Sequence, residues 1–349
     1  MGSVSLYNIS KQFSASVCAL DNVSIEILPG ELVAILGSSG CGKTTLLRVI
    51  AGLEQPTTGQ VVINGRDVTQ TQTRDRPIGM VFQSYALFPN MTVRQNIAFP
   101  LMVRKRSTRF IRERVDELLE LVQLKAQADR YPNQISGGQQ QRTALARALA
   151  PSPAVLLLDE PLSALDTLVR QQLREQIRQI QQTLQITTLF VTHDQSEAMS
   201  IADRIAIMSQ GKIEQMSSPF ELYEAPATQF SASFFGNRNV LELPIREGQI
   251  HLGNFLQLPA SGIVGERAIV FFRPEDVELG ANEQGHPAQV ETKLFQGMLT
   301  RLQLIIEADG QINRFYATMP SREAIDFQPG STMQVYVNPA YVRVFPADS

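Results

Sequence analysis

The chain has 349 residues, with 31 Lys and Arg against 34 Asp and Glu, a formal charge of −3 and a pI near 5.8. The absence of a strong positive charge argues against a protein that is mainly bound to nucleic acid. Hydrophobic residues make up 43% of the chain, which is typical of a globular protein and too many for a disordered one. At roughly 150 residues per domain, this length predicts about two domains.

The chain shows no basic segment followed by an apolar run at its start, and no stretch approaches 18 consecutive apolar residues. We therefore expect no secretory signal and no crossing of a bilayer. Cys18 and Cys41 are predicted to be reduced thiols of a cytosolic protein. A redox sensor at Cys41 is the weaker alternative, because nothing nearby requires a reactive thiol. The histidines are too scattered to predict a metal site; they are His193, His251 and His286.

The first two-thirds of the chain alternates short apolar runs with amphipathic stretches, which is typical of an α/β fold. Three continuous apolar runs predict strands that are covered on both faces, at residues 32–36, 154–158 and 187–191. Apolar residues at helical spacing predict two helices. The first helix carries Ile111, Val115, Leu118, Leu119 and Val122, and the second carries Leu168, Leu173, Ile177, Ile180 and Leu184.

The pattern changes near residue 217, and long helical patterns stop after Gly236. From there on, short alternating runs at residues 268–272, 300–304 and 333–337 predict strands, and Asp309-Gly310 predicts a hairpin turn. We therefore expect an α/β domain at residues 1–236, followed by an all-β domain at residues 237–349.

Residues 37–44 read Gly-Ser-Ser-Gly-Cys-Gly-Lys-Thr, which fits the phosphate-loop pattern between a buried strand and a helix. Glycines leave the backbone N–H groups free to point at phosphate oxygens, and the start of the helix adds a favourable dipole. We expect Lys43 to meet the β- and γ-phosphates and the Thr44 hydroxyl to bind Mg²⁺. A glycine-rich turn without a ligand is the weak alternative.

The run Leu156-Leu157-Leu158 leads directly into Asp159 and Glu160. A carboxylate at the end of a buried strand can reach the metal held by Thr44, which predicts that role for Asp159. Glu160, one residue further on, is predicted to polarise the attacking water. Taken alone, this acidic pair is equally compatible with a strand end that faces solvent and has no catalytic role.

His193 and Gln83 also follow apolar runs that we place in the same sheet. We expect His193 to hydrogen-bond the γ-phosphate or the water, and Gln83 to contact the metal or orient the water. The residues after Gln83, Tyr85-Ala86-Leu87-Phe88-Pro89, predict an exposed aromatic patch for a protein partner.

Residues 135–142 read Ile-Ser-Gly-Gly-Gln-Gln-Gln-Arg and open a helix. Ser136 and the N–H groups of Gly137 and Gly138 can bind a phosphate through the helix dipole, although Ser136 can equally be an ordinary N-cap. The spacing alone does not decide whether this site and the phosphate loop serve one nucleotide within a chain or two across a dimer.

Taken in order, these motifs resemble those of ATP-binding cassette (ABC) ATPases over about residues 4–235. They are Gly37–Thr44, Gln83, Ser136-Gly137-Gly138-Gln139, Leu158-Asp159-Glu160, Ser163-Ala164-Leu165-Asp166 and His193. The region after residue 240, with Phe272-Arg273-Pro274-Glu275-Asp276, looks like the regulatory domain of binding-protein-dependent importers. The resemblance implies an α/β P-loop NTPase cassette with a helical subdomain, followed by an all-β, oligonucleotide-binding-like (OB-like) regulatory domain.

The resemblance also implies a role for each matching residue, with ATP and Mg²⁺ as the cofactors. Glu160 would be the general base, assisted by His193 and Gln83, while Thr44, Gln83 and Asp159 would hold Mg²⁺. Phe13 would stack on adenine, although an ordinary core phenylalanine is the alternative. The remaining nucleotide-binding positions would be Gly37, Ser38, Ser39, Gly40, Cys41, Gly42, Lys43, Thr44, Thr45, Ser136, Gly137, Gly138, Gln139 and Asp166.

In this family two cassettes sandwich two ATP molecules, so the resemblance implies a homodimer in which each signature completes the partner's site. It further implies integral membrane permease subunits, a soluble substrate-binding protein, no nucleic acid, and a peripheral position on the cytoplasmic face of the inner membrane. Two departures from the family pattern, Ile135 and Gln140, leave every chemical position filled.

The motifs contact only nucleotide and partners, so they do not identify the cargo. General resemblance points to the ferric iron, sulfate, polyamine and maltose group, with a slight preference for ferric iron. The alternatives are a soluble ABC ATPase acting on ribosomes or DNA, and a sensing module controlled by nucleotide.

Overall fold

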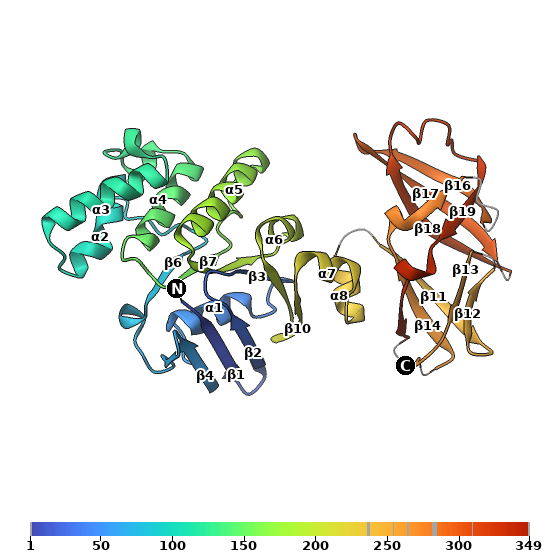
Figure 1. Ribbon diagram of the computed structural model, residues 1–349, viewed down its shortest axis with the longest axis horizontal. Helices are drawn as coiled ribbons and strands as arrows, with labels where there is room; N and C mark the ends of the chain where they lie inside the picture. Colours follow the sequence, from blue (N-terminus) through green and yellow to red (C-terminus); the bar gives the residue numbers. More distant parts are fainter. Residues whose placement is uncertain are drawn as a thin grey trace. The chain divides into compact units, whose positions relative to one another are not determined.

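The computed structural model describes residues 2–235, 238–253, 255–263, 265–280, 285–308 and 310–347. The chain divides into two compact units, residues 1–222 and 223–349. The expected domain boundary at 236/237 stays a prediction, because both residues lie outside the described ranges. The first unit is α/β and the second is all-β apart from short helical turns, as the sequence predicts (Figure 1).

The central sheet of the first unit has the strand order β10-β9-β3-β8-β7-β6, and all its neighbouring pairs are parallel except β10 with β9. The runs predicted as buried strands become β3, β7 and β8, and every residue in them is buried. The strands of this sheet are β3 (Leu32–Gly37), β6 (Ile78–Val81), β7 (Val155–Asp159), β8 (Thr187–Thr192), β9 (Arg204–Ser209) and β10 (Lys212–Ser217).

An antiparallel sheet with the order β2-β1-β4-β5 lies on the other side of helix α1 (Lys43–Ala51). The two sheets and α1 share one apolar core, which includes Val4, Leu46 and Val155. Figure 1 shows α1 between β3 and the sheet that contains β1, β2 and β4. The strands of this second sheet are β1 (Val4–Ser14), β2 (Val17–Ile27), β4 (Thr58–Ile63) and β5 (Arg66–Asp67).

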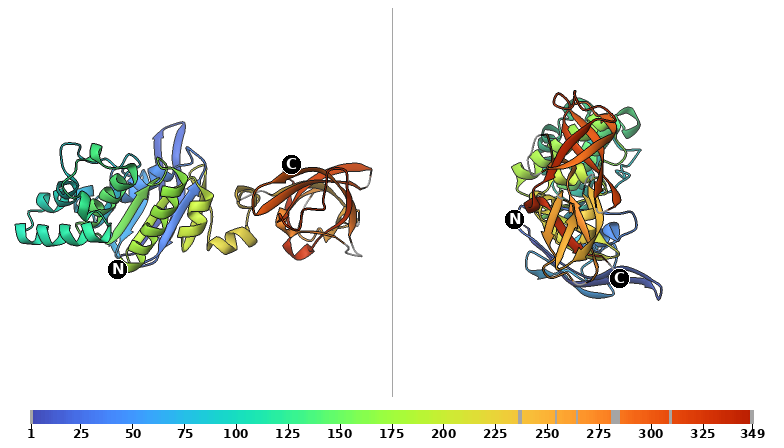
Figure 2. Two further views of the ribbon diagram at one scale, coloured as in Figure 1. Left: turned by 90° about the horizontal axis from the view of Figure 1, so that it is seen from above. Right: turned by 90° about the vertical axis from the view of Figure 1, so that its right-hand side faces the viewer.

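The opposite face of the central sheet is covered by helices that form a second core with β7 and β8 (Figures 1 and 2). The helices of this unit after α1 are α2 (Val93–Val103), α3 (Thr108–Leu121), α4 (Gly137–Leu149), α5 (Thr167–Leu184) and α6 (Gln195–Ile201). Single 3₁₀ turns lie at Thr73–Asp75, Lys125–Gln127 and Pro132–Gln134.

Both predicted helical stripes are present, but the second is wrong at its ends. Leu173, Ile177 and Ile180 of α5 are buried, whereas Leu168 is 75% exposed and Leu184 is 37% exposed. Leu168 precedes Leu173 by five residues, which places it off the apolar face of a helix with 3.6 residues per turn. Leu184 is the last residue of α5, next to the C-cap Gln185, where the chain leaves the helix.

The second unit begins within α7 (Pro219–Glu224) and continues through α8 (Gln229–Phe234) into two sheets, with the orders β13-β12-β11-β14-β20 and β15-β19-β16-β17-β18. Alternate residues of both sheets form one core around Phe255, Phe272 and Phe315. The strands are β11 (Asn239–Arg246), β12 (Gln249–Leu252), β13 (Leu256–Pro259), β14 (Arg267–Phe272), β15 (Val277–Leu279), β16 (His286–Phe295), β17 (Leu299–Ala308), β18 (Gln311–Pro320), β19 (Thr332–Val337) and β20 (Arg343–Pro346).

The predicted hairpin lies between β17 and β18, which pair antiparallel from Leu299 opposite Pro320 to Ala308 opposite Gln311. Gly310 has φ +72°, a conformation that glycine adopts without cost. Asp309, the other residue of the predicted turn, lies outside the described residues.

Candidate nucleotide-binding site

The phosphate loop joins β3 to α1 at the carboxyl edge of the central sheet. Gly42 has φ +108°, and a Cβ there would lie only 2.4 Å from the Ala19 carbonyl oxygen. Gly40 has φ +80°, and nothing lies within 4 Å of the position that its Cβ would take. Glycine is therefore required at Gly42 by space and at Gly40 by backbone conformation, and the loop forms an open cradle of the kind that binds phosphate.

Lys43 opens α1, and its side chain turns back over this loop. Its Nζ donates to the carbonyl oxygens of Gly37 and Ser38, both at 2.8 Å, and the residue is only 5% exposed. Cys41 Sγ lies 3.8 Å from the same Nζ. The cation is thus held at the floor of the loop, at a position predicted from the sequence to meet phosphates.

Thr44 and Asp159 come together from two different elements. The Thr44 Oγ1 donates to Asp159 Oδ1 at 3.3 Å, although the two residues are 115 positions apart. Asp159 ends β7 and is buried, and this burial raises the pKa of its carboxyl above the ordinary range despite the hydrogen bond from Thr44. A desolvated carboxylate beside a hydroxyl oxygen is a donor set that suits Mg²⁺, so these residues fit the ion.

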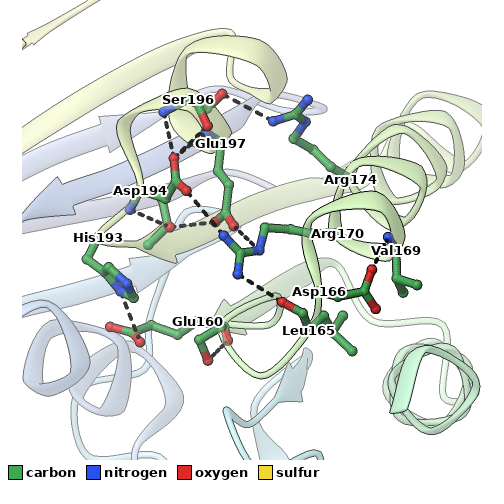
Figure 3. Close-up of polar contacts among 12 residues, drawn as sticks. Glu160, Leu165, Asp166, Val169, Arg170, Arg174, His193, Asp194, Ser196 and Glu197 are labelled. Atoms are coloured by element: carbon green, nitrogen blue, oxygen red, sulfur yellow. Dashed lines mark hydrogen bonds and ion pairs between the residues drawn. The ribbon is translucent and has the colours of Figure 1, made fainter. Parts of the chain in front are cut away.

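Glu160 lies next to two polar side chains from neighbouring strands. The Gln83 Nε2 donates to Glu160 Oε2 at 3.2 Å. His193 Nδ1 lies 3.3 Å from the same oxygen (Figure 3). Glu160 has φ +43°, a left-handed backbone conformation, directly after β7 ends at Asp159. Of the three residues predicted as the catalytic group, Gln83 and His193 therefore both contact Glu160.

Gln83 and Glu160 border a cleft of about 360 Å³ above the phosphate loop. Its lining contains Gln83 and Glu160 together with Ala19, Ser39, Gly40, Gly42, Lys43, Thr44 and Thr45. Residues 136–139 are not part of this lining. The cleft is thus bounded by the phosphate loop on one side and by the strand-end residues on the other.

Arg170 of α5 joins two loops that border this site, and sequence reasoning missed it. Its Nη2 donates to the Leu165 carbonyl oxygen at 2.9 Å, while its Nη1 lies 3.5 Å from Asp194 Oδ2 (Figure 3). Its Nε lies 3.7 Å from Glu197 Oε1. Leu165 precedes Asp166, and Asp194 follows His193, so one guanidinium connects both loops. No sequence motif announces this contact, because an arginine on a helix is ordinarily a solvated residue.

The pKa values of the two carboxyl groups around Arg170, those of Glu197 and Asp194, are shifted in opposite directions. Burial raises the pKa of Glu197, although its Oε2 accepts a 2.6 Å hydrogen bond from Thr192 Oγ1. Burial also acts to raise the pKa of Asp194, but hydrogen bonds from Ser196 and from the Glu197 backbone outweigh it and lower the pKa overall. Asp194 is therefore the firmly ionised member, and it caps α6 beside His193.

The segment at residues 136–139 begins α4 and is held by a reciprocal cap. The Ser136 Oγ accepts from the Gln139 backbone N–H at 3.4 Å, and the Gln139 side chain accepts from the Ser136 N–H at 3.0 Å. The N-cap considered from the sequence is therefore present. A Cβ at Gly138 would lie 3.0 Å from the Val169 side chain, so the start of α4 packs closely against α5. Asp166 caps α5 through the Val169 N–H at 3.1 Å.

The aromatic residues depart from expectation in one respect. Phe13 is 55% exposed, with Lys11 Nζ 4.9 Å from its ring centroid, so it is not an ordinary core residue. Tyr85 was expected in an exposed patch, and this prediction is wrong because the residue is only 7% exposed. Its φ of +59° turns the ring into the core shared with α2 and α4, and its hydroxyl has no partner there.

Phe88 does border an open surface, a second and largely apolar cleft of about 460 Å³. Arg147 of α4 forms part of this surface, with its guanidinium 5.6 Å from the Phe88 ring centroid. The same guanidinium donates to the carbonyl oxygens of Tyr85 and Ala86, both at 2.8 Å. The cleft, called the Phe88 groove below, is lined by residues of β6, α2 and α4, including Met80, Phe82, Phe99 and Arg104.

Cys18 is exposed and Cys41 is buried, and both are free thiols. Within the described ranges, no group of three or more His, Cys, Asp or Glu side chains is arranged to hold a metal ion. The helices in the described part of the chain include none that is both long and apolar enough to span a bilayer.

A phosphate loop after the buried parallel strand β3, with a carboxylate at the end of β7 two strands away in the same sheet, defines a nucleotide-binding cassette of the P-loop NTPase class. Comparison with known families agrees. Residues 20–163 match the ABC transporter family and residues 270–345 match the TOBE domain.

Similar proteins cover nearly the whole chain. The sulfate/thiosulfate import ATP-binding protein CysA of Synechococcus elongatus is 46% identical over 98% of this chain and 96% of its own length. That of Nitrosomonas europaea is 45% identical over 98% and 97%. A dimeric structure of the ATP-binding cassette MJ0796 bound to ADP and Pi has a TM-score of 0.56 at 35% identity, covering 62% of this chain and 98% of that one. The chain therefore belongs to the ABC transporter family, as an ATP-hydrolysing subunit of an importer.

Proposed function

We propose that this chain powers the import of sulfate or thiosulfate, working as a homodimer on integral membrane subunits. The observation that carries the site assignment is the position of Glu160, held between Gln83 and His193 at the edge of the phosphate-loop cleft. The cargo assignment is supported by the similar proteins, which are named for sulfate/thiosulfate import. Those names do not support the expected ferric iron, and no iron cargo is proposed.

Glu160 acts as the general base in this proposal. Its carboxylate lines the cleft and can accept a proton from water, and the contacts of Gln83 and His193 fix its orientation. His193 then lies where it can contact the γ-phosphate or the attacking water. Lys43 and the N–H groups of residues 37–45 bind the phosphates, because the cation and the loop amides converge on the same cleft.

Thr44 and Asp159, with Gln83, would hold Mg²⁺ through hard oxygen ligands. The ion supplies neutralisation of phosphate charge when it is bound. Phe13 offers an exposed ring for adenine, beside the ammonium group of Lys11.

The signature residues Ser136, Gly137, Gly138 and Gln139 complete the site of a second copy in this proposal. They do not line the cleft of their own chain, although their N–H groups begin a helix suited to an anion. The dimeric state of the similar cassette MJ0796 supports the same arrangement. Asp166, which lies beside this segment at the start of α5, would contact the partner.

The Phe88 groove is proposed to receive a short helix from the membrane subunit. Its lining is largely apolar, and it joins β6, which leads to Gln83, with α4, which begins at the signature. A helix seated there would contact both halves of the nucleotide machinery. In this proposal the subunit lies at the cytoplasmic face of the membrane, and a soluble binding protein delivers cargo to the other side.

The test is transport by the assembled importer in proteoliposomes that contain this chain, its membrane subunits and the binding protein. ATP-dependent uptake of labelled sulfate, reduced by excess thiosulfate and abolished by Glu160→Gln, is expected. Uptake of ferric iron, or hydrolysis that does not respond to a sulfate-loaded binding protein, would contradict the cargo assignment. The Phe88→Ala variant should retain ATP binding but lose stimulation by the membrane subunits.

A further inference from the structure

The connection between α2 and α3 carries an unusual charge for this protein. Residues 104–114 contain six Lys or Arg and a single Glu, in a chain whose net charge is −3. Among the described residues, only Arg109 and Arg114 of these six cations form ion pairs, and Arg114 pairs with Glu117 at 2.8 Å. Arg109 pairs with Glu113 at 2.8 Å, but both side chains are largely exposed, so the pair contributes little. The segment is therefore a local positive surface on an acidic protein.

This surface, called the α2–α3 basic patch, combines cations with apolar side chains. Its residues are Lys105, Arg106, Arg109 and Arg112, all exposed, together with Val103 at 64% exposure and Phe110 at 44%. The Arg106 guanidinium lies 5.9 Å from the Phe110 ring centroid. Exposed apolar side chains among cations are typical of a surface that meets a headgroup region rather than water alone.

The charges of the patch do not serve the stability of α3. The helix dipole favours acidic residues in the first turn and basic residues in the last. Helix α3 has neither: Arg109 lies in its first turn, Arg112 follows it, and Glu120 lies in its last turn. This reversed arrangement costs the helix some stability, so the cations require another explanation.

The patch is continuous with the surface proposed to face the membrane. Arg104, which joins α2 to the patch, also lines the Phe88 groove beside Phe99 and Pro100. Figure 1 shows the α2–α3 connection at the far end of helices α2 and α3, away from the sheet that contains β1, β2 and β4. A partner seated in the groove would bring the patch to the surface of the bilayer that contains this partner.

We propose that the α2–α3 basic patch binds the anionic phospholipid headgroups around the membrane subunits. Its cations face lipid phosphates, while Val103 and Phe110 reach the boundary with the acyl chains. Charge complementarity and continuity with the groove favour a lipid surface, and the exposed apolar side chains distinguish it from a purely acidic peptide site. The membrane orientation rests on the proposed function, but lipid binding by the patch can be measured on the chain alone.

The experiment is flotation of the purified full chain with vesicles of phosphatidylcholine, with and without phosphatidylglycerol. We expect binding only to the vesicles that contain phosphatidylglycerol, and its loss as salt concentration rises. The double variant R106Q/R109Q should bind roughly 25-fold more weakly, at about fivefold for each cation removed near the surface. The matched control R66Q/R74Q removes two exposed cations of the same unit and should bind like the unsubstituted chain.

Equal binding to both vesicles, or equal loss in R106Q/R109Q and the control, would overturn the lipid inference. If R106Q/R109Q leaves vesicle binding unchanged but prevents assembly with the membrane subunits, the patch binds protein, and the lipid inference is likewise wrong. Sulfate uptake by the reconstituted importer is measured separately, so failure of lipid binding leaves the proposed function intact. If uptake fails while vesicle binding is retained, the proposed function is wrong and the lipid inference stands.

Discussion

Replacing Arg170 with methionine should uncouple the two loops that it connects. The guanidinium hydrogen bond to the Leu165 carbonyl oxygen, at 2.9 Å, contributes about 1 kcal/mol net. Its contact with Glu197, at 3.7 Å, adds roughly 1–2 kcal/mol, because the Glu197 side chain is only 5% exposed while Arg170 is 30% exposed and partly screened. We expect Arg170→Met to destabilise the first unit by roughly 2–3 kcal/mol.

A double-mutant cycle with Glu197→Gln isolates the charge contribution. The amide of Gln can still accept the hydrogen bond from Thr192, but it needs no cation. The double variant should therefore cost about 1 kcal/mol less than the sum of the two single variants. The measurement is urea unfolding of the four chains, read from the transition of the first unit, with Arg174→Met as a control. Arg174 lies one turn further along α5, and among the described residues its one hydrogen bond goes to the Ser196 carbonyl oxygen, at 3.4 Å.

The penalty of Arg170→Met should also depend on pH. Burial already raises the pKa of Glu197, and loss of the cation raises it further. A raised carboxyl pKa gives stability that is present at low pH and lost as pH rises, so the penalty should shrink on acidification. Additive substitutions, a penalty no larger than that of Arg174→Met, or a penalty that grows at low pH would refute this reasoning.

Three further results are expected. Glu160→Gln should abolish hydrolysis while leaving ATP binding intact in equilibrium dialysis. Hydrolysis at the rate of the unsubstituted chain would show that Glu160 is not the general base. Arg76 is only 1% exposed and donates to carbonyl oxygens at the end of α1, so Arg76→Met should destabilise the first unit by about 3 kcal/mol or more in urea unfolding; a loss below about 1 kcal/mol would contradict this. Burial and then the hydrogen bond to Glu275 raise the pKa of Tyr223 to about 12, so this contact contributes stability below pH 10 that disappears as pH rises toward 12. Tyr223→Phe should remove the highest-pH step from the ultraviolet titration of tyrosinate, and an unchanged titration would refute this assignment.

Much of the cassette could be predicted from the sequence because its signals are local. The apolar runs that become β3, β7 and β8 are buried on both faces, and such strands need no alternation. Polar residues that follow parallel strands meet at one sheet edge, so the proximity of Asp159 to Thr44 follows from topology. The same rule brings His193 to Glu160.

Other features depend on contacts that no local pattern encodes. Tyr85 lies in a segment that reads as exposed, but its left-handed backbone conformation directs the ring into the core. Arg147 holds that turn from α4, 62 positions away along the chain. In the sequence, Arg170 looks like a solvated helix residue. In the structure, the packing of α5 against α6 places two carboxylates beside it. The cargo could not be predicted for a different reason: the described site residues lie at the nucleotide cleft and do not contact the cargo.

The central claim is that one ATP is held by two chains, by Lys43 of one and by Ser136 of the other. Lys43→Ala and Ser136→Arg should each be inactive alone, because every site in either homodimer has one defective half. Mixed dimers contain one site with both halves intact. The account predicts that single-turnover ATP hydrolysis reappears when the two variants are mixed. Hydrolysis by Ser136→Arg alone at the unsubstituted rate, or a mixture as inactive as its components, would contradict it.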